Sequence, residues 1–146
     1  MKPKFIYAYM QTAEIFAELS YARRLHVGAI IVKDDRIISI GYNGMPAHWD
    51  NDCEDVIQHS DDTTSLKTKP EVLHAETNAI AKLAKSNESG LDADMFITHA
   101  PCLDCAKLIY QSGIRSVFYR DAYRSEDGIQ FLERSKVNVT QVKKGP

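Results

Sequence analysis

Hydrophobic periodicity predicts one helix and a pair of strands in the first part of the chain. Residues 4–23 carry apolar side chains near the 3.6-residue period, which is typical of an amphipathic helix. Residues 26–33 form a continuous apolar, β-branched run that indicates a strand buried on both faces. Two aspartates then predict a tight turn into an antiparallel strand at 36–42.

In the second part of the chain, helical and strand patterns alternate. A helix is expected from Pro70 and Glu71 to about residue 87. It is followed by a strand at 95–99, a helix at 103–112, a strand at 116–120, a helix at 126–135 and a strand at 137–142. This alternation is typical of parallel strands joined by helices. The sequence therefore predicts an α/β fold, a three-layer α/β/α sandwich with a central mixed five-stranded sheet, in a single domain over residues 1–146.

A polar insert at about 44–71 interrupts this pattern. Between Asp50 and Asp62 it carries six acidic residues and no Lys or Arg. Connections of this length are uncommon inside a domain and usually form functional lids or disordered inserts. We therefore expect a lid or a disordered segment whose acidic side chains are solvated.

Composition narrows the class of protein. The 146 residues have a net charge of −2, with 44% hydrophobic and 26% charged residues, as in ordinary globular domains. No apolar run is long enough to cross a membrane, the N-terminus does not resemble a signal peptide, and three cysteines do not suggest a disulfide framework. We expect a cytoplasmic protein without a membrane partner. The acidic balance also disfavours nucleic acid as a partner.

Two short motifs, HAE and PCLDC, carry the candidate chemistry. Cys102 and Cys105 are three positions apart at an expected helix start, so both sulfurs can reach one metal ion. The helix N-terminus favours thiolates, and His74 supplies a third ligand. Three protein ligands leave the fourth position of Zn²⁺ open, which is typical of a catalytic site. Glu76 is then the candidate base.

Two other interpretations compete for the CxxC pair. It is also found in redox-active proteins, and a structural zinc would need a fourth ligand, for which Cys53 is the remaining cysteine. The joint pattern of H-x-E followed by P-C-x-x-C is much more specific than either motif alone. It is the known signature of zinc deaminases.

At this point the sequence resembles the cytidine deaminase-like superfamily, and within it the deoxycytidylate (dCMP) deaminases. The resemblance runs from Ser20 to about residue 142. It rests on VGAIIV at 27–32, RIISIGYNGMP at 36–46, HAETNAI at 74–80 and PCLDCAKLIYQSGI at 101–114. It implies hydrolytic deamination of dCMP to dUMP, which supplies thymidylate synthesis.

The resemblance implies a role for each matching residue. His74, Cys102 and Cys105 would bind one Zn²⁺ per chain, and Glu76 would shuttle protons between water, the pyrimidine ring and the leaving ammonia. The substrate-binding residues would be Asn43, Ala75 through its backbone N–H, Ser20 and Tyr123. Independently of the resemblance, a 5′-phosphate needs a cation, for which the candidates are Arg23, Arg24, Arg120 and Arg124. Arg124 is also a candidate substrate-binding residue, because it follows a predicted parallel strand, at the end where such folds place ligands.

The resemblance also implies regulation and assembly. The relatives are commonly homo-hexamers with dCTP and dTTP as effectors, and Mg²⁺ would accompany such a triphosphate. Gly44 and Lys85 are the candidate allosteric residues. Some relatives hold a second, structural zinc in the insert, but here only Cys53 would be available for it. His99 also departs from the small or apolar residue expected before the Pro-Cys motif.

Two alternative functions stay open. A tRNA or other nucleic-acid base deaminase shares the HAE and PCxxC motifs, although base editing on a polymer needs a basic groove that the acidic balance disfavours. A binding module with a structural zinc is the other alternative. Glu76 argues against it, because such a module has no use for a carboxylate at this position.

Overall fold

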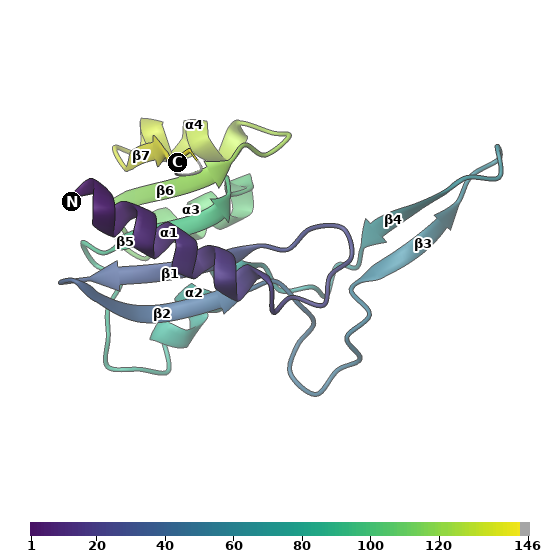
Figure 1. Cartoon of the computed structure of the whole chain (residues 1–146), viewed down its shortest axis with the longest axis horizontal. Coiled ribbons are helices and arrows are strands. Elements are labelled where there is room, and N and C mark those ends of the chain that lie inside the picture. The colour runs from purple at the N-terminus through teal and green to yellow at the C-terminus, as the bar shows by residue number, and fades with distance from the viewer. Residues whose placement is uncertain (144–146) are drawn as a thin grey trace.

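A five-stranded sheet forms the centre of the protein (Figure 1), and the computed structural model describes residues 1–143. The strand order is β2-β1-β5-β6-β7. β1 is antiparallel to β2 and β5, whereas β5, β6 and β7 are parallel, so the predicted mixed sheet is confirmed. The strands are β1 (Gly28–Lys33), β2 (Arg36–Tyr42), β5 (Asp94–His99), β6 (Ser116–Asp121) and β7 (Asn138–Gln141).

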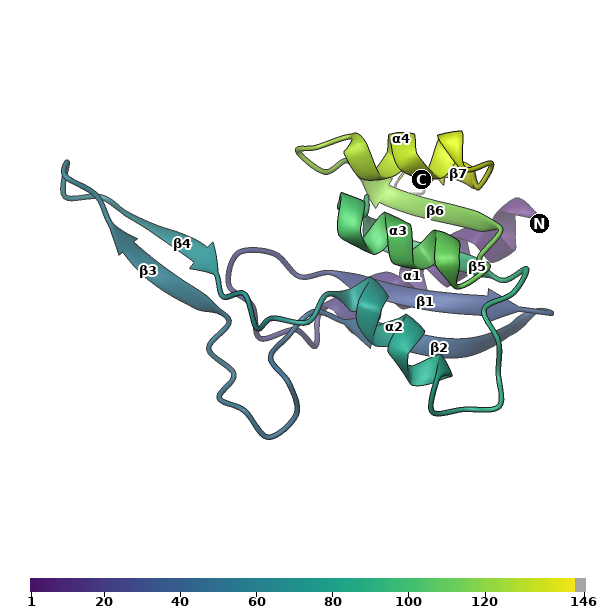
Figure 2. The ribbon, with the colours of Figure 1, turned by 180° about the vertical axis from the view of Figure 1, so that it is seen from behind.

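Helices cover both faces of this sheet. One face carries α1, and the other carries α2, α3 and α4, as the two opposite views show (Figures 1 and 2). The helices are α1 (Pro3–Ala17), α2 (Ala75–Leu83), α3 (Leu103–Gln111) and α4 (Asp127–Arg134). Ile30 packs in the core under α1 and Ile31 in the core under α2, because successive strand residues face opposite ways. The predicted three-layer sandwich is confirmed.

The polar insert folds as a hairpin that projects from the body (Figures 1 and 2). β3 (Glu54–Gln58) and β4 (Thr64–Thr68) pair with each other in a separate two-stranded sheet. The expectation of a disordered insert is therefore wrong, whereas a role of this segment as a lid stays a prediction. Glu54 is buried, so the expectation that the acidic side chains of the insert are solvated is also wrong at this residue. Most residues on both faces of the hairpin are partly or fully exposed, so its sequence lacks the apolar alternation by which half-buried strands are recognised.

Two predicted helices are too long, because tertiary contacts claim the backbone at their ends. α1 ends at Ala17 rather than at residue 23, and the N–H groups of Arg23 and Arg24 donate to Glu54 instead of to helical carbonyls. α2 begins at Ala75 rather than at Pro70. Before it, Leu73 forms a two-way backbone bridge with Gly44, with N···O distances of 2.8 and 3.1 Å, which requires extended backbone. Among residues 1–143, no helix has the length and apolar character that a membrane crossing requires.

Gly41 of β2 allows the start of α2 to lie directly on the sheet. A Cβ atom at this position would collide with the carbonyl oxygen of Ala75 and would lie 2.7 Å from the amide nitrogen of Ala79. Neither backbone atom can move without shifting the helix. The absence of a side chain at Gly41 therefore determines where the N-terminus of α2 lies.

We predict that Gly41→Ala destabilises the protein by about 1–3 kcal/mol, the usual cost of overpacking a rigid contact. The measurement is the free energy of unfolding from urea denaturation. Gly44→Ala is the matched control, because a Cβ atom there meets no atom within 4 Å. Equal stability of the two variants would contradict this account of the α2 contact.

Candidate active site

The first turns of α2 and α3 lie close together at the end of the sheet where β5 and β6 terminate. His74 is the N-cap residue of α2, and Cys102 is the N-cap residue of α3. Cys105 lies in the first turn of α3. In α/β sheets the carboxyl ends of parallel strands are the usual place for a ligand. Residues distant in sequence thus meet where the fold favours a site.

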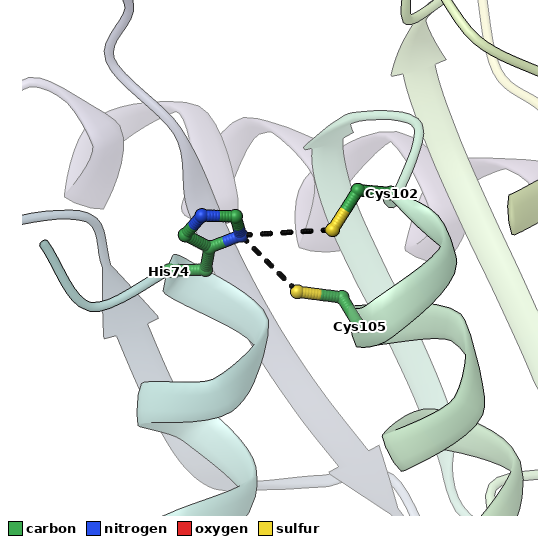
Figure 3. Close-up of side chains that lie close together, drawn as sticks. All are labelled: His74, Cys102 and Cys105. Atoms are coloured by element: carbon green, nitrogen blue, oxygen red, sulfur yellow. Dashed lines mark hydrogen bonds between the residues drawn. The ribbon is translucent and has the colours of Figure 1, made fainter. Parts of the chain in front are cut away.

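The three predicted metal ligands converge on one point (Figure 3). Nδ1 of His74 lies 3.3 Å from Sγ of Cys105 and 3.8 Å from Sγ of Cys102. All three ligand atoms lie within 4.8 Å of one another. Tetrahedral zinc with Zn–N of about 2.1 Å and Zn–S of about 2.3 Å separates N from S by about 3.6 Å. The donor set and its spacing therefore fit Zn²⁺.

Hydrogen bonds prepare one of the two thiols as a thiolate. Hydrogen bonds from Cys105 and His74 lower the pKa of Cys102 to about 4. The hydrogen bond with Cys102, together with burial, raises the pKa of Cys105, and the hydrogen bond with Cys102 also raises the pKa of His74. These shifts favour the thiolate form of Cys102, in which cysteine binds a metal, and metal binding releases the protons that remain on the cluster.

Glu76 is a buried carboxyl group beside this cluster. It is 4% exposed, lies in the first turn of α2 and lines the same cavity as His74 and Cys102. Burial raises the pKa of Glu76 above its ordinary value, and the nearby His74 opposes this effect. A raised pKa makes this carboxylate a stronger base than an ordinary glutamate, which suits a group that must take up and release a proton.

The cavity at this site is lined by segments from across the fold. Besides His74, Glu76 and Cys102, it is lined by Ala22, Arg24, Leu25, Val27, Asn43, Glu54, Thr68, Val72, Ala75, His99, Ala100 and Tyr123. Ala75 is the first residue of α2, so its N–H has no intrahelical acceptor and is available to a ligand. Three predicted substrate-binding residues, Asn43, Ala75 and Tyr123, therefore lie in the cavity wall.

Asn43 also stabilises that wall. Its Oδ1 accepts a hydrogen bond from the N–H of Val27 at 2.9 Å, and its Nδ2 donates to the carbonyl of Leu25 at 2.8 Å. Ser20 is not a lining residue. Its hydroxyl donates to the Asn43 carbonyl at 2.8 Å and accepts from the N–H of Ala22. Ser20 thus supports the wall from behind.

Only one of the four candidate cations for a phosphate lines this cavity. That residue is Arg24. Arg23 is engaged elsewhere, since its Nη2 lies 3.1 Å from Oδ1 of Asp52 and its Nε 3.5 Å from Oε1 of Glu54. An arginine already paired with two carboxylates is a poor phosphate ligand.

The other two candidates lie near the cavity but outside its wall. Arg120 pairs with Glu14 at 3.0 Å and with Asp121 at 2.9 Å. The guanidinium of Arg124 lies over the ring of Tyr123, 5.7 Å from its centroid. The structure thus places Arg124 against a lining residue rather than in the lining itself.

Of the two candidate allosteric residues, only Gly44 lines a cavity other than the active-site cavity. Gly44 lines a second cavity, next to Tyr21, Leu73 and Lys82. Lys85 is not one of its lining residues, and α2 contributes Asn78 and Lys82 instead. The amino group of Lys82 donates to the carbonyl of Ile40 at 2.6 Å.

Sequence reasoning missed three polar residues of the main cavity, namely Glu54, Thr68 and His99. Glu54 and Thr68 belong to the insert, and nothing in the sequence indicated that these two side chains would lie against the active-site cavity. His99 ends β5 just before the Pro-Cys motif, and burial lowers the pKa of its imidazole, which Asp121 opposes. Its position before that motif was the one available signal.

The buried Cys53 does not belong to a metal cluster. It packs with Ala22 and Val72 in a small apolar core. Within residues 1–143, the one group of three or more potential metal ligands is His74, Cys102 and Cys105. A second zinc site in the insert therefore has no support in the described part of the chain.

A family model and several known proteins match this chain, and they point to the same family. Residues 3–121 match the model of the cytidine and deoxycytidylate deaminase zinc-binding region. Deoxycytidylate deaminase of Saccharomyces cerevisiae is 32% identical over 97% of this chain and 46% of its own length. The human deoxycytidylate deaminase is 40% identical over 82% of this chain and 66% of its own length, so the chain spans less than two thirds of either relative.

A solved structure is also similar over almost the whole chain. The dCMP deaminase of cyanophage S-TIM5, in complex with dCMP and dUMP, aligns with a TM-score of 0.87 and 45% identity. The alignment covers 97% of this chain and 99% of that one. The similarity therefore includes the projecting hairpin segment and is not confined to the motifs.

We predict that the purified protein binds one zinc ion per chain and that Cys102→Ala loses most of it, because a thiolate ligand is removed. Elemental analysis after dialysis against a weak chelator measures the zinc content. Cys53→Ala is the control, since this cysteine lies outside the cluster. Full zinc content in Cys102→Ala would contradict the assignment of the ligands.

Proposed function

Because the chain belongs to the cytidine and deoxycytidylate deaminase family, we propose that it hydrolyses dCMP to dUMP and ammonia. The observation that carries this proposal is the composition of one cavity. Its wall contains His74 and Cys102 of the zinc-type ligand set, the buried residue Glu76 and Arg24, and the third ligand, Cys105, lies next to His74. These three features match the needs of a reaction at a pyrimidine amino group within a phosphorylated substrate.

His74, Cys102 and Cys105 would hold the zinc ion. When bound, zinc lowers the pKa of a coordinated water and so supplies the nucleophile near neutral pH. Glu76 then takes a proton from the attacking water and delivers it to N3 of cytosine while oxygen bonds to C4. A second proton transfer through Glu76 converts the amino group into ammonia, which leaves as the C4–N bond breaks.

Arg24 would select the 5′-phosphate. A nucleotide phosphate carries close to two negative charges, and arginine binds such groups with charge-assisted hydrogen bonds. Nη1 of Arg24 donates to Oγ1 of Thr68 at 3.0 Å. The Nε and Nη2 groups of Arg24 have no hydrogen-bond partner among residues 1–143, so they remain available to a phosphate.

The proposal favours a mononucleotide over a nucleic acid. A polymer substrate requires a basic groove beyond the reacting base. Next to this cavity lies the insert, which carries six acidic residues and no Lys or Arg between Asp50 and Asp62. These charges would repel the phosphates that flank the reacting base in a polymer.

The proposal extends to regulation and assembly. The second cavity beside Gly44 is the candidate position for a dCTP or dTTP effector, with Mg²⁺ bound to the triphosphate. Lys82 is a cation in its wall. A homo-hexamer is likewise proposed from the family resemblance alone.

We predict that Glu76→Gln keeps its zinc but loses at least ~10²-fold in kcat, because the amide cannot accept and return a proton. Ammonia release from dCMP measures the rate, and elemental analysis measures the metal. Glu71→Gln, an exposed position three residues before His74, serves as the control. Wild-type activity of Glu76→Gln would place the proton shuttle on another residue.

We predict that dCMP exceeds deoxycytidine roughly 30- to 1000-fold in kcat/KM, because the nucleoside leaves the phosphate-binding group unpaired. Arg24→Met should reduce this ratio to near unity. Arg36→Met, which removes a surface arginine paired with Glu88 outside the cavity, should leave the ratio unchanged.

The same comparison separates the alternative functions. Equal kcat/KM for dCMP and deoxycytidine in the wild type would indicate a nucleoside deaminase. Efficient turnover of cytosine in a single-stranded oligonucleotide would indicate a nucleic-acid base deaminase. Zinc binding without turnover of any of these substrates would indicate a structural zinc module.

A further inference from the structure

The base of the β3–β4 hairpin reaches into the wall of the active-site cavity. Glu54 is the first residue of β3 and Thr68 the last residue of β4, and the two are paired across the hairpin. Both line the cavity. The rest of the hairpin projects away from the body (Figure 1), so this closing pair is where the hairpin meets the site.

Glu54 holds the backbone of the segment that carries Arg24. Its Oε2 accepts hydrogen bonds from the N–H groups of Arg23 and Arg24 at 2.8 and 2.9 Å. The side chain of Glu54 is 1% exposed. A buried carboxylate that accepts two backbone hydrogen bonds fixes those residues far more strongly than a solvated one would.

Thr68 holds the other end of Arg24. Its Oγ1 accepts a hydrogen bond from Nη1 of Arg24 at 3.0 Å. One cross-strand pair therefore contacts both the backbone amide and the guanidinium of the single arginine in the cavity wall. An arginine side chain has many rotamers, and fixing its backbone at one end and its guanidinium at the other restricts which of them is occupied.

Arg23 is the counter-ion of Glu54, so the positive charge of Arg24 is not neutralised by that carboxylate. Oε1 of Glu54 has no hydrogen-bond partner among the described residues, and its closest cation is Nε of Arg23 at 3.5 Å. A buried carboxylate without a counter-ion would attract the Arg24 guanidinium and weaken its interaction with an anion. With Arg23 in this place, Arg24 remains the positive group that faces the cavity.

We infer that Glu54 and Thr68 are positioning residues that clamp Arg24 in the orientation required for binding the 5′-phosphate of the substrate. The inference rests on the phosphate role proposed above for Arg24. It gives the base of the insert a defined part in substrate selection. The hairpin in effect sets the phosphate end of the cavity, while α2 and α3 set the metal end.

The principal test is Thr68→Val, which removes the hydroxyl with little change in shape. KM for dCMP should rise about 3- to 10-fold, the effect of losing one hydrogen bond, whereas kcat for dCMP and kcat/KM for deoxycytidine should stay unchanged. Thr68→Ser retains the hydroxyl and should restore KM. Thr64→Val, at the far end of the same strand, is the matched control and should behave as wild type.

A double-mutant cycle tests whether Thr68 acts through Arg24. In the Arg24→Met background, Thr68→Val should cause no further rise in KM for dCMP, because the clamped group is absent. An additive effect would mean that the hydroxyl contacts the substrate directly, and it would overturn the inference. Binding of dUMP and of deoxyuridine, measured by calorimetry, repeats the cycle without depending on turnover.

Glu54 is tested with two substitutions of different chemistry. Glu54→Gln keeps an oxygen acceptor for the two backbone N–H groups and should preserve most of the preference for dCMP. Glu54→Ala should lose that preference. Equal losses for dCMP and deoxycytidine in Glu54→Ala would indicate a purely structural role and contradict the clamp.

Two failures are distinguishable in these experiments. If Arg24→Met leaves the ratio of dCMP to deoxycytidine unchanged, the phosphate role of Arg24 is wrong and the clamp is wrong with it. If Arg24→Met lowers the ratio of kcat/KM for dCMP to that for deoxycytidine, but Thr68→Val and Glu54→Ala do not alter it, only the positioning role of Thr68 and Glu54 is wrong.

Discussion

The active site depends on two helices whose N-cap side chains meet. His74 and Cys102 cap different helices, yet Nδ1 of the first and Sγ of the second lie 3.8 Å apart. The position of α3 follows from its place between the parallel strands β5 and β6. The position of α2 follows from Gly41, over which the backbone of α2 comes into direct contact with the sheet. The metal centre is thus a consequence of helix packing.

The cavity has two ends that are built by different parts of the chain. Helix N-termini form the metal end, where unpaired backbone N–H groups and positive potential favour thiolates and polar ligands. The loop after α1 and the base of the hairpin form the other end, where Arg24 lies between Glu54 and Thr68. If Arg24 binds the phosphate as proposed, this division separates the chemistry from substrate selection, and changes in the insert would alter which substrate binds without disturbing the reaction.

Much of the body of the fold was predictable because its signals are local. The buried run of β1 and the alternation of helices and strands after residue 94 predicted the mixed sheet and its layers. The hairpin escaped prediction because most of its residues on both faces are exposed, so no alternation marks it. α1 was predicted to end too late and α2 to begin too early. The reason is that Glu54 and Gly44 form hydrogen bonds with backbone groups that a longer helix would otherwise use.

The sequence by itself was enough to predict that His74, Cys102 and Cys105 would lie together and to single out Glu76, because a histidine, a carboxylate and two cysteines at these spacings form a specific motif. Only the tertiary structure decided which of the four candidate arginines lines the cavity. Each has the same charge in the sequence, and what distinguishes them is the partner that each one meets. Arg23 and Arg120 meet carboxylates, Arg124 meets the ring of Tyr123, and Arg24 alone lines the cavity. Such contacts join residues that are up to 106 positions apart in the chain (Glu14 and Arg120), so no local pattern records them.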